Sequence, residues 1–146
     1  KAGRYNHTDI AAAFEDALQA LRVGIDVNSK YTVDFRGVLV DALVAKGYTI
    51  VDGQEADNLD VIVRAIIRIE DGGKGGSQAE DIHFARAIVQ IDVVQSKGGL
   101  VLGSVSQSRK EGHRTLAEAE RLAVRKLAKK ISRYVGEKID LAITGL

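Results

Sequence analysis

The segment that most constrains the fold is an alternating run, LDVIVRAIIRIE, at residues 59–70. All of its odd positions are apolar, whereas its even positions include aspartate, arginine and glutamate. Successive side chains of a strand point to opposite faces, so the odd positions form one continuous apolar face. The run therefore predicts a long strand in a sheet that is covered on one side.

A glycine-rich stretch, EDGGKGGSQAED at residues 70–81, separates this run from two further strand patterns. Residues 81–95 alternate apolar with polar side chains, and residues 100–108 return as a partner strand after a short turn at Gly98 and Gly99. Consecutive strands with short connections pair antiparallel. We therefore expect a three-stranded antiparallel meander.

Helical and strand patterns also alternate in the N-terminal part of the chain. Apolar spacings of three and four predict a helix from about residue 8 to residue 21. Residues 21–28 then alternate as a half-buried strand does, and a glycine and β-branched residues argue against a continuing helix. A second helix begins at Thr32 and ends at Gly47, and a short strand follows at residues 48–51.

The C-terminal part predicts one long helix. It opens with the capping box TLAE, in which Thr115 and Glu118 can satisfy free backbone amides. Apolar positions then recur at helical spacing, in a stripe broad enough to cover a sheet: Leu116, Ala119, Ala123, Leu127, Ile131, Tyr134 and Val135.

Together these elements predict an α+β fold. We expect an antiparallel sheet of four to five strands with helices packed on one face, closed by the long C-terminal helix, as a two-layer sandwich. A chain of 146 residues has the size of one domain, and no linker or repeat divides it. Residues 1–146 are accordingly predicted to form a single domain.

Composition excludes several classes of function. Lys plus Arg number 21 and Asp plus Glu number 20, and a net charge of +1 argues against a dedicated nucleic-acid binder. There is no cysteine, which excludes disulfides, thiolate metal sites and a cysteine nucleophile. No run approaches the ~18 apolar residues that a membrane-spanning helix requires.

The glycine-rich stretch does not fit a phosphate-binding loop. A Walker loop ends in Gly-Lys-Ser/Thr and leads directly into a helix, whereas Lys74 is followed by Gly75 and then by a predicted strand. Acidic residues on both sides would repel phosphate. We interpret residues 71–79 as a flexible hairpin tip. Its central residues are Gly72, Gly73, Lys74, Gly75 and Gly76.

No set of residues has the spacing that catalysis or metal binding requires. His7, His83 and His113 lie in three separate segments, and a metal site would need them brought together with a carboxylate. Paired carboxylates such as Glu15 and Asp16 lie on predicted helix surface, where acid–base catalysis is not favoured. We therefore predict a protein that is not an enzyme, with no catalytic residue, no cofactor and no metal.

One basic face remains as a candidate binding surface. It lies on the last helix, opposite the apolar stripe, and comprises Arg121, Arg125, Lys126, Lys129, Lys130 and Arg133. Anionic lipid or nucleic acid could bind there through phosphates, but no aromatic residues interleave to stack on bases, which disfavours nucleic acid. The alternatives are a solvated helix surface and a contact with anionic lipid or an acidic partner.

Three short motifs resemble those of a known family. They are VNS at residues 27–29, LVDALVAKGYTIV at residues 39–51 and AEDIHFARAIVQIDV at residues 79–93. In this order they resemble the TraT family of outer-membrane lipoproteins, which act in conjugal surface exclusion and serum resistance. The order of elements alone resembles, more loosely, the envelope lipoproteins LptE and CsgG.

The chain also departs from the TraT-like pattern. That family carries a long apolar insertion between its two central strands, which serves as a membrane-embedded hairpin, whereas this chain has only GGKGGSQ at residues 72–78. No cysteine for lipid attachment is present among these residues. The resemblance therefore implies the scaffold and not membrane insertion.

The resemblance implies a non-enzymatic structural or assembly module of the bacterial cell envelope, in the periplasm or at the outer membrane. The expected partners are copies of the chain itself or other envelope proteins. The long strands at residues 59–70 and 81–95 would offer an edge for strand addition. The alternative is a binding module that uses the basic C-terminal helix for anionic lipid or nucleic acid.

Overall fold

The computed structural model describes the chain in several segments. These are residues 13, 16–17, 20–28, 32–51, 58–76 and 81–145. The helix predicted at residues 8–21 lies for the most part outside them and stays a prediction. Among the described residues, no helix is long and apolar enough to cross a membrane.

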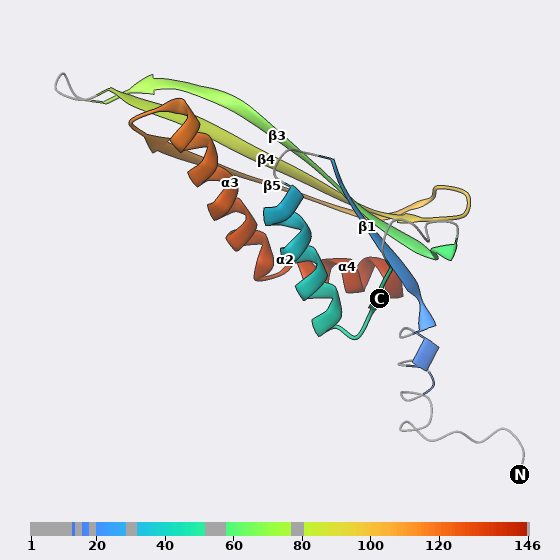
Figure 1. The fold of residues 1–146 in the computed structure, drawn as a ribbon. Helices are drawn as coiled ribbons and strands as arrows, with labels where there is room; N and C mark the ends of the chain where they lie inside the picture. The colour runs from blue at the N-terminus through green and yellow to red at the C-terminus, as the bar shows by residue number, and fades with distance from the viewer. Residues whose placement is uncertain are drawn as a thin grey trace, which may run out of the picture.

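A five-stranded sheet forms one layer of the molecule (Figure 1). From one edge to the other, its strands are β2 (Thr49–Ile50), β1 (Arg22–Asn28), β3 (Val61–Gly75), β4 (Ile82–Gln95) and β5 (Val101–His113). Both pairs within β3, β4 and β5 are antiparallel, which confirms the predicted meander. The prediction of a strand at residues 21–28 is also confirmed.

The sheet is mixed, and the prediction of a wholly antiparallel sheet is correct only for the meander. β1 runs parallel to both of its neighbours, because Val23 pairs with Ile50 of β2 and with Val61 of β3. Helix α2 (Thr32–Ala45) connects β1 to β2. Parallel neighbours need such a crossover, whereas the alternation that identifies a strand says nothing about its direction.

Helices α2, α3 (Leu116–Ser132) and α4 (Val135–Thr144) lie on one face of the sheet, which confirms the α+β class with a helical layer (Figure 1). The predicted single C-terminal helix is instead α3 and α4. The helix is interrupted at Tyr134, whose φ of −139° is not helical. The break lets α4 pack against α2, where a Cβ on Gly136 would lie 3.2 Å from the Ala42 carbonyl oxygen.

The apolar core lies between the helical layer and the sheet. The odd positions of β3 and β4 face it, as the alternation predicts. The largest fully buried side chains are Phe35, Leu39 and Leu43 of α2, Ile91 of β4, Leu127 and Ile131 of α3, and Ile139 of α4. Among the described residues no polar or charged residue is buried, so apolar packing holds the two layers together.

A side-chain hydrogen bond connects the chain after α2 to α4. The Tyr48 hydroxyl donates to Asp140 Oδ1 at 2.6 Å. Burial of the phenol, then the hydrogen bond to Asp140 and its negative charge, raise the pKa of Tyr48. The phenol therefore stays protonated and keeps donating at neutral pH.

Residues 72–75 of the glycine-rich stretch belong to a strand and not to the loop that the sequence predicts. β3 continues through Gly75 and stays paired with β4 as far as Ile82. Gly72, Gly73 and Lys74 are accordingly part of the strand. Gly76 follows the end of β3, and the remainder of the predicted tip, at residues 77–79, lies outside the described residues.

The position of Phe84 on β4 gives the physical reason for these glycines. A Cβ on Gly75 would lie 2.9 Å from Phe84 Cε2, and one on Gly112 of β5 would lie 2.8 Å from Phe84 Cε1. Gly73 has a φ of 87° beside an irregularity in the β3–β4 pairing, a conformation that glycine adopts without strain. The glycines thus make room for an aromatic ring within a long hairpin.

The other face of the sheet carries no helix among the described residues (Figure 1). Polar side chains form a row across it, in which Arg64 Nε lies 3.6 Å from Asp26 Oδ2 and the Ser104 hydroxyl donates to Asp92 Oδ1 at 2.6 Å. Ile66 lies on the same face of β3, two residues after Arg64, and is 40% exposed. Such a mixture is typical of a sheet that faces water on one side.

Candidate functional site

Four of the six predicted basic residues line one groove, which runs between α3 and β5. The groove has a volume of about 350 Å³ and is lined by Lys126, Lys129, Lys130 and Arg133 of α3 and by Arg109 of β5. We call it the basic groove. Residues four apart on a helix are neighbours. Lys126 with Lys130, and Lys129 with Arg133, therefore form two adjacent rows along α3.

The other two predicted residues, Arg121 and Arg125, lie nearer the start of α3 at a separate hollow that they share with His113 and Glu118. There the Thr115 hydroxyl accepts a hydrogen bond from the Glu118 backbone amide at 3.2 Å, which confirms this half of the predicted capping box. The Glu118 carboxylate lies 2.6 Å from His113 Nδ1. The predicted basic face is thus divided between two places.

One carboxylate, that of Glu111, lies beside the basic groove and contacts two of the cations that line it. Glu111 Oε1 accepts a hydrogen bond from Arg109 Nη2 at 3.0 Å and lies 3.1 Å from Lys126 Nζ. Burial alone would raise the pKa of Glu111, but the hydrogen bonds and positive charges of Lys126 and Arg109 outweigh it, and the pKa is lowered. Glu111 is therefore ionised at neutral pH and compensates part of the charge of these two cations.

The basic groove keeps an excess of positive charge. Lys129 and Arg133 have no ion-pair partner among the described residues. Lys130 Nζ donates to the Ser108 carbonyl oxygen at 3.4 Å, which is a contact without a counter-charge. An anionic group in the groove would therefore meet three cations that no carboxylate compensates.

The basic groove lies beside an open edge of the sheet, formed by β5. The prediction that residues 59–70 and 81–95 offer an edge is wrong for β4 and for β3 as far as Ile66, which have a neighbouring strand on both sides; beyond Ile66, β3 pairs with β4 alone among the described residues. The Ser108 carbonyl accepts from Lys130 and so faces away from β4. Peptide groups alternate in direction along a strand, and the backbone groups of Ser106 and Lys110 therefore face the same open side.

Two of the three histidines meet across the sheet. His83 of β4 lies directly opposite His113 of β5, a proximity that the sequence does not predict. Within the part of the chain that the structure describes, however, no group of three or more His, Asp or Glu side chains could hold a metal ion. His7 lies outside that part.

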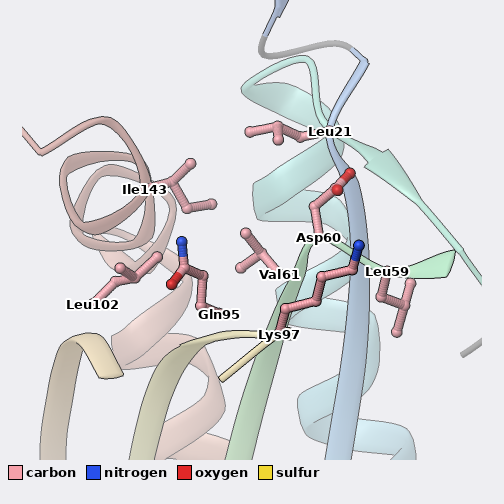
Figure 2. Close-up of a pocket in the computed structure, with 8 residues that line it drawn as sticks. All are labelled: Leu21, Leu59, Asp60, Val61, Gln95, Lys97, Leu102 and Ile143. Atoms are coloured by element: carbon pink, nitrogen blue, oxygen red, sulfur yellow. The ribbon is translucent and has the colours of Figure 1, made fainter. Parts of the chain in front are cut away.

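A second hollow, of about 410 Å³, lies where α4 approaches the ends of β1, β3 and β4 (Figure 2). Its lining comprises Leu21, Leu59, Asp60, Val61, Gln95, Lys97, Leu102 and Ile143. Asp60 Oδ2 accepts the Arg22 amide at 2.9 Å, and the Asp60 amide donates to the Arg22 carbonyl oxygen at 2.9 Å. Asp60 thus fastens β1 to the start of β3, and this lining has no serine, threonine or histidine.

Reasoning from the sequence missed Arg109 and Glu111. Both lie on β5, outside the helix that carries the other groove residues. Their alternation gives the available signal, because Arg109 and Glu111 occupy odd positions of a strand and so share one face. That this face adjoins α3 depends on how the elements pack.

No family model matches the sequence, and no curated protein matches it. Solved structures do match. A minor lipoprotein of Acinetobacter baumannii has a TM-score of 0.53 at 13% identity, covering 83% of this chain and 94% of that chain. A candidate lipoprotein of Caulobacter crescentus has a TM-score of 0.53 at 10% identity, covering 91% and 96%. A protein of Xanthomonas campestris has a TM-score of 0.53 at 10% identity, covering 81% and 84%.

The chain therefore shares its fold with bacterial lipoproteins. This likeness confirms the coarse part of the sequence-based resemblance, an envelope-lipoprotein scaffold, and it does not single out the TraT-like family. At such low identity the likeness concerns the fold alone.

Proposed function

We propose that this chain is a non-enzymatic module of the bacterial cell envelope that works by assembling with other envelope proteins or with copies of itself. The observation that supports this most is the fold, which it shares with bacterial lipoproteins over most of both chains. A location in the periplasm or at the outer membrane, and kinship with the TraT-like family, belong to the same proposal. The kinship is supported by the three motifs at residues 27–29, 39–51 and 79–93.

The geometry favours assembly over chemistry. β5 leaves one edge of the sheet open, and the outer face carries no helix among the described residues. Asp60, the carboxylate of the second hollow, is already engaged by the Arg22 amide. Ile66, with 40% of its surface exposed on the outer face, offers an apolar contact for a second copy.

Location is tested by expressing the full-length gene product in a Gram-negative host and separating its membranes on a density gradient. We expect the protein in the periplasmic or outer-membrane fraction, with mass spectrometry of its N-terminus reporting any attached lipid. Recovery in the cytoplasmic fraction alone would contradict the envelope part of the proposal.

Self-association is tested by light scattering on the purified chain over a range of concentrations. We expect a mass that rises with concentration and that Ile66→Glu lowers, because the charge would be desolvated in an apolar contact. Val44→Glu is the matched control, since Val44 is 55% exposed on α2 at the opposite side of the molecule. A monomer at every concentration would leave only partners other than the chain itself.

A further inference from the structure

The open edge and the basic groove lie together along β5. Lys130 joins them, because its Nζ donates to the carbonyl oxygen of Ser108 on the open side of the strand. A strand that paired with β5 on this side would run beneath the cations of α3. The backbone groups of Ser106, Ser108 and Lys110 would supply its hydrogen bonds.

The spacing of the cations matches that of an extended peptide. Lys126 and Lys130 are one helical repeat apart, as are Lys129 and Arg133, and four residues of helix rise about 6 Å. Alternate side chains on one face of a strand are about 6.6 to 6.8 Å apart. Carboxylates at every second position of an extended segment would therefore have about the same spacing as the cations within each of the two rows.

A second copy of this chain is a poor occupant of the same edge. In an antiparallel pair of β5 strands about a two-fold axis near Gln107, Ser108 of one copy would face Ser106 of the other. Two basic grooves, each with its excess of positive charge, would then adjoin across the axis and repel each other. Cations at a sheet edge are a known protection against such pairing.

We propose that the β5 edge accepts an extended acidic segment of a partner protein, which adds to the sheet as a further strand and places alternate carboxylates over the basic groove. On binding, Lys130 exchanges the Ser108 carbonyl for a carboxylate, and the incoming strand takes the freed carbonyl. Hydrogen bonds to β5 supply affinity, and Lys129, Lys130 and Arg133 select for acidic sequence. This inference rests on the proposed assembly function for the source of the partner.

The direct test measures binding of a short fluorescent peptide, in which Glu alternates with Thr or Val, to the full chain by anisotropy. We expect binding that weakens steeply as salt rises. A matched peptide with Gln in place of Glu should bind about tenfold more weakly or not at all. Equal binding of the two peptides would overturn the proposal.

Paired charge variants locate the binding site on α3. Lys129→Gln with Lys130→Gln should weaken binding of the acidic peptide about tenfold. Arg121→Gln with Arg125→Gln removes the same charge from the same helix outside the basic groove, and should leave the affinity within about twofold. Equal losses in both double variants would mean a diffuse charge effect and overturn the proposal.

A proline substitution separates strand pairing from charge. Ser106→Pro removes an outward amide donor from β5 while keeping every cation, and an edge strand tolerates proline where its amide faces solvent. Binding should be lost in Ser106→Pro and kept in Ser106→Ala, with circular dichroism confirming that both fold. Full binding to a folded Ser106→Pro chain would overturn strand addition.

Other occupants give different results. The chain could fail to bind the peptide but cosediment with anionic vesicles. If Lys129→Gln with Lys130→Gln then abolished cosedimentation, the groove would be assigned to lipid headgroups and the proposal overturned. The same double variant could dimerise while neither it nor the wild type binds the peptide. The cations would then serve only to prevent pairing at the β5 edge, which would also overturn the proposal. The peptide assay uses purified protein, so its failure would leave a positive fractionation result, and with it the proposed function, intact.

Discussion

Strands β4 and β5 differ sharply, although they are neighbours in one sheet and helix α3 covers both. The inward residues of β4 include Val89 and Ile91, which are fully buried beneath α3. On the β5 side the inward residues include Arg109 and Glu111, which reach out toward the lysines of the same helix. Stability is thus concentrated over β3 and β4, whereas the β5 margin remains available for a partner.

The largest expected effect is on the buried side. Leu127→Ala should lower the free energy of unfolding by about 3 kcal/mol, because Leu127 is fully buried in α3 and its truncation leaves a cavity. Ile66→Ala on the outer face should cost less than about 1 kcal/mol. Urea denaturation measures both. Similar losses would break the contrast between a closed face and an open one.

A smaller loss is expected where α4 meets β5. A Cβ added at Gly103 would lie 2.8 Å from the Ala142 Cβ, so Gly103→Ala should destabilise the protein by about 1 to 3 kcal/mol through overpacking. Ala142→Gly in the same chain should recover part of this loss, which thermal unfolding of the double-mutant cycle measures. No coupling between the two sites would mean that α4 is not packed closely on β5.

Loss of the Tyr48 hydroxyl should have an effect of about 1 to 2 kcal/mol, because Tyr48→Phe leaves Asp140 without its donor. The raised pKa of Tyr48 gives the sign of the pH dependence. The stabilisation is complete below the pKa of a free tyrosine, about 10, and is lost as pH rises above it. The difference between wild type and Tyr48→Phe should therefore shrink in strong alkali, and a constant difference would contradict the contact.

The smallest expected change in stability is at the groove itself. Glu111→Gln should cost less than about 1 kcal/mol, because its two cations are nearly half exposed. Its pKa is lowered, so its contribution is present at neutral pH and disappears as pH falls through and below the usual range of a glutamate. The same variant removes the carboxylate from Arg109 and Lys126 and should therefore tighten binding of the acidic peptide. Glu137→Gln, at an exposed position of α4, should leave that binding unchanged.

Local patterns predict local structure well in this chain. The alternation at residues 59–70 identifies both the long β3 strand and the face that it buries. Thr115 marks the start of α3 because its hydroxyl accepts the amide three residues later. Each of these signals depends on residues close together in the sequence, where periodicity and capping act.

Relations between distant segments were beyond reach of those patterns. The parallel pairing of β1 with β3 joins Val23 to Val61, and nothing near either residue specifies the partner. The glycines before residue 76 resemble a loop until Phe84 is placed among them. In the same way the basic face on α3 becomes a groove only when Arg109 arrives from β5.

The position of α3 near the end of the chain has a consequence for how the protein is made. Residues 116–144 supply the helices that close the core over β4 and β5. A chain synthesised or exported from its N-terminus therefore presents the apolar strands before their cover exists. The nascent chain therefore exposes aggregation-prone apolar strands until the last helices emerge, and a chain truncated before Leu116 would expose that surface permanently.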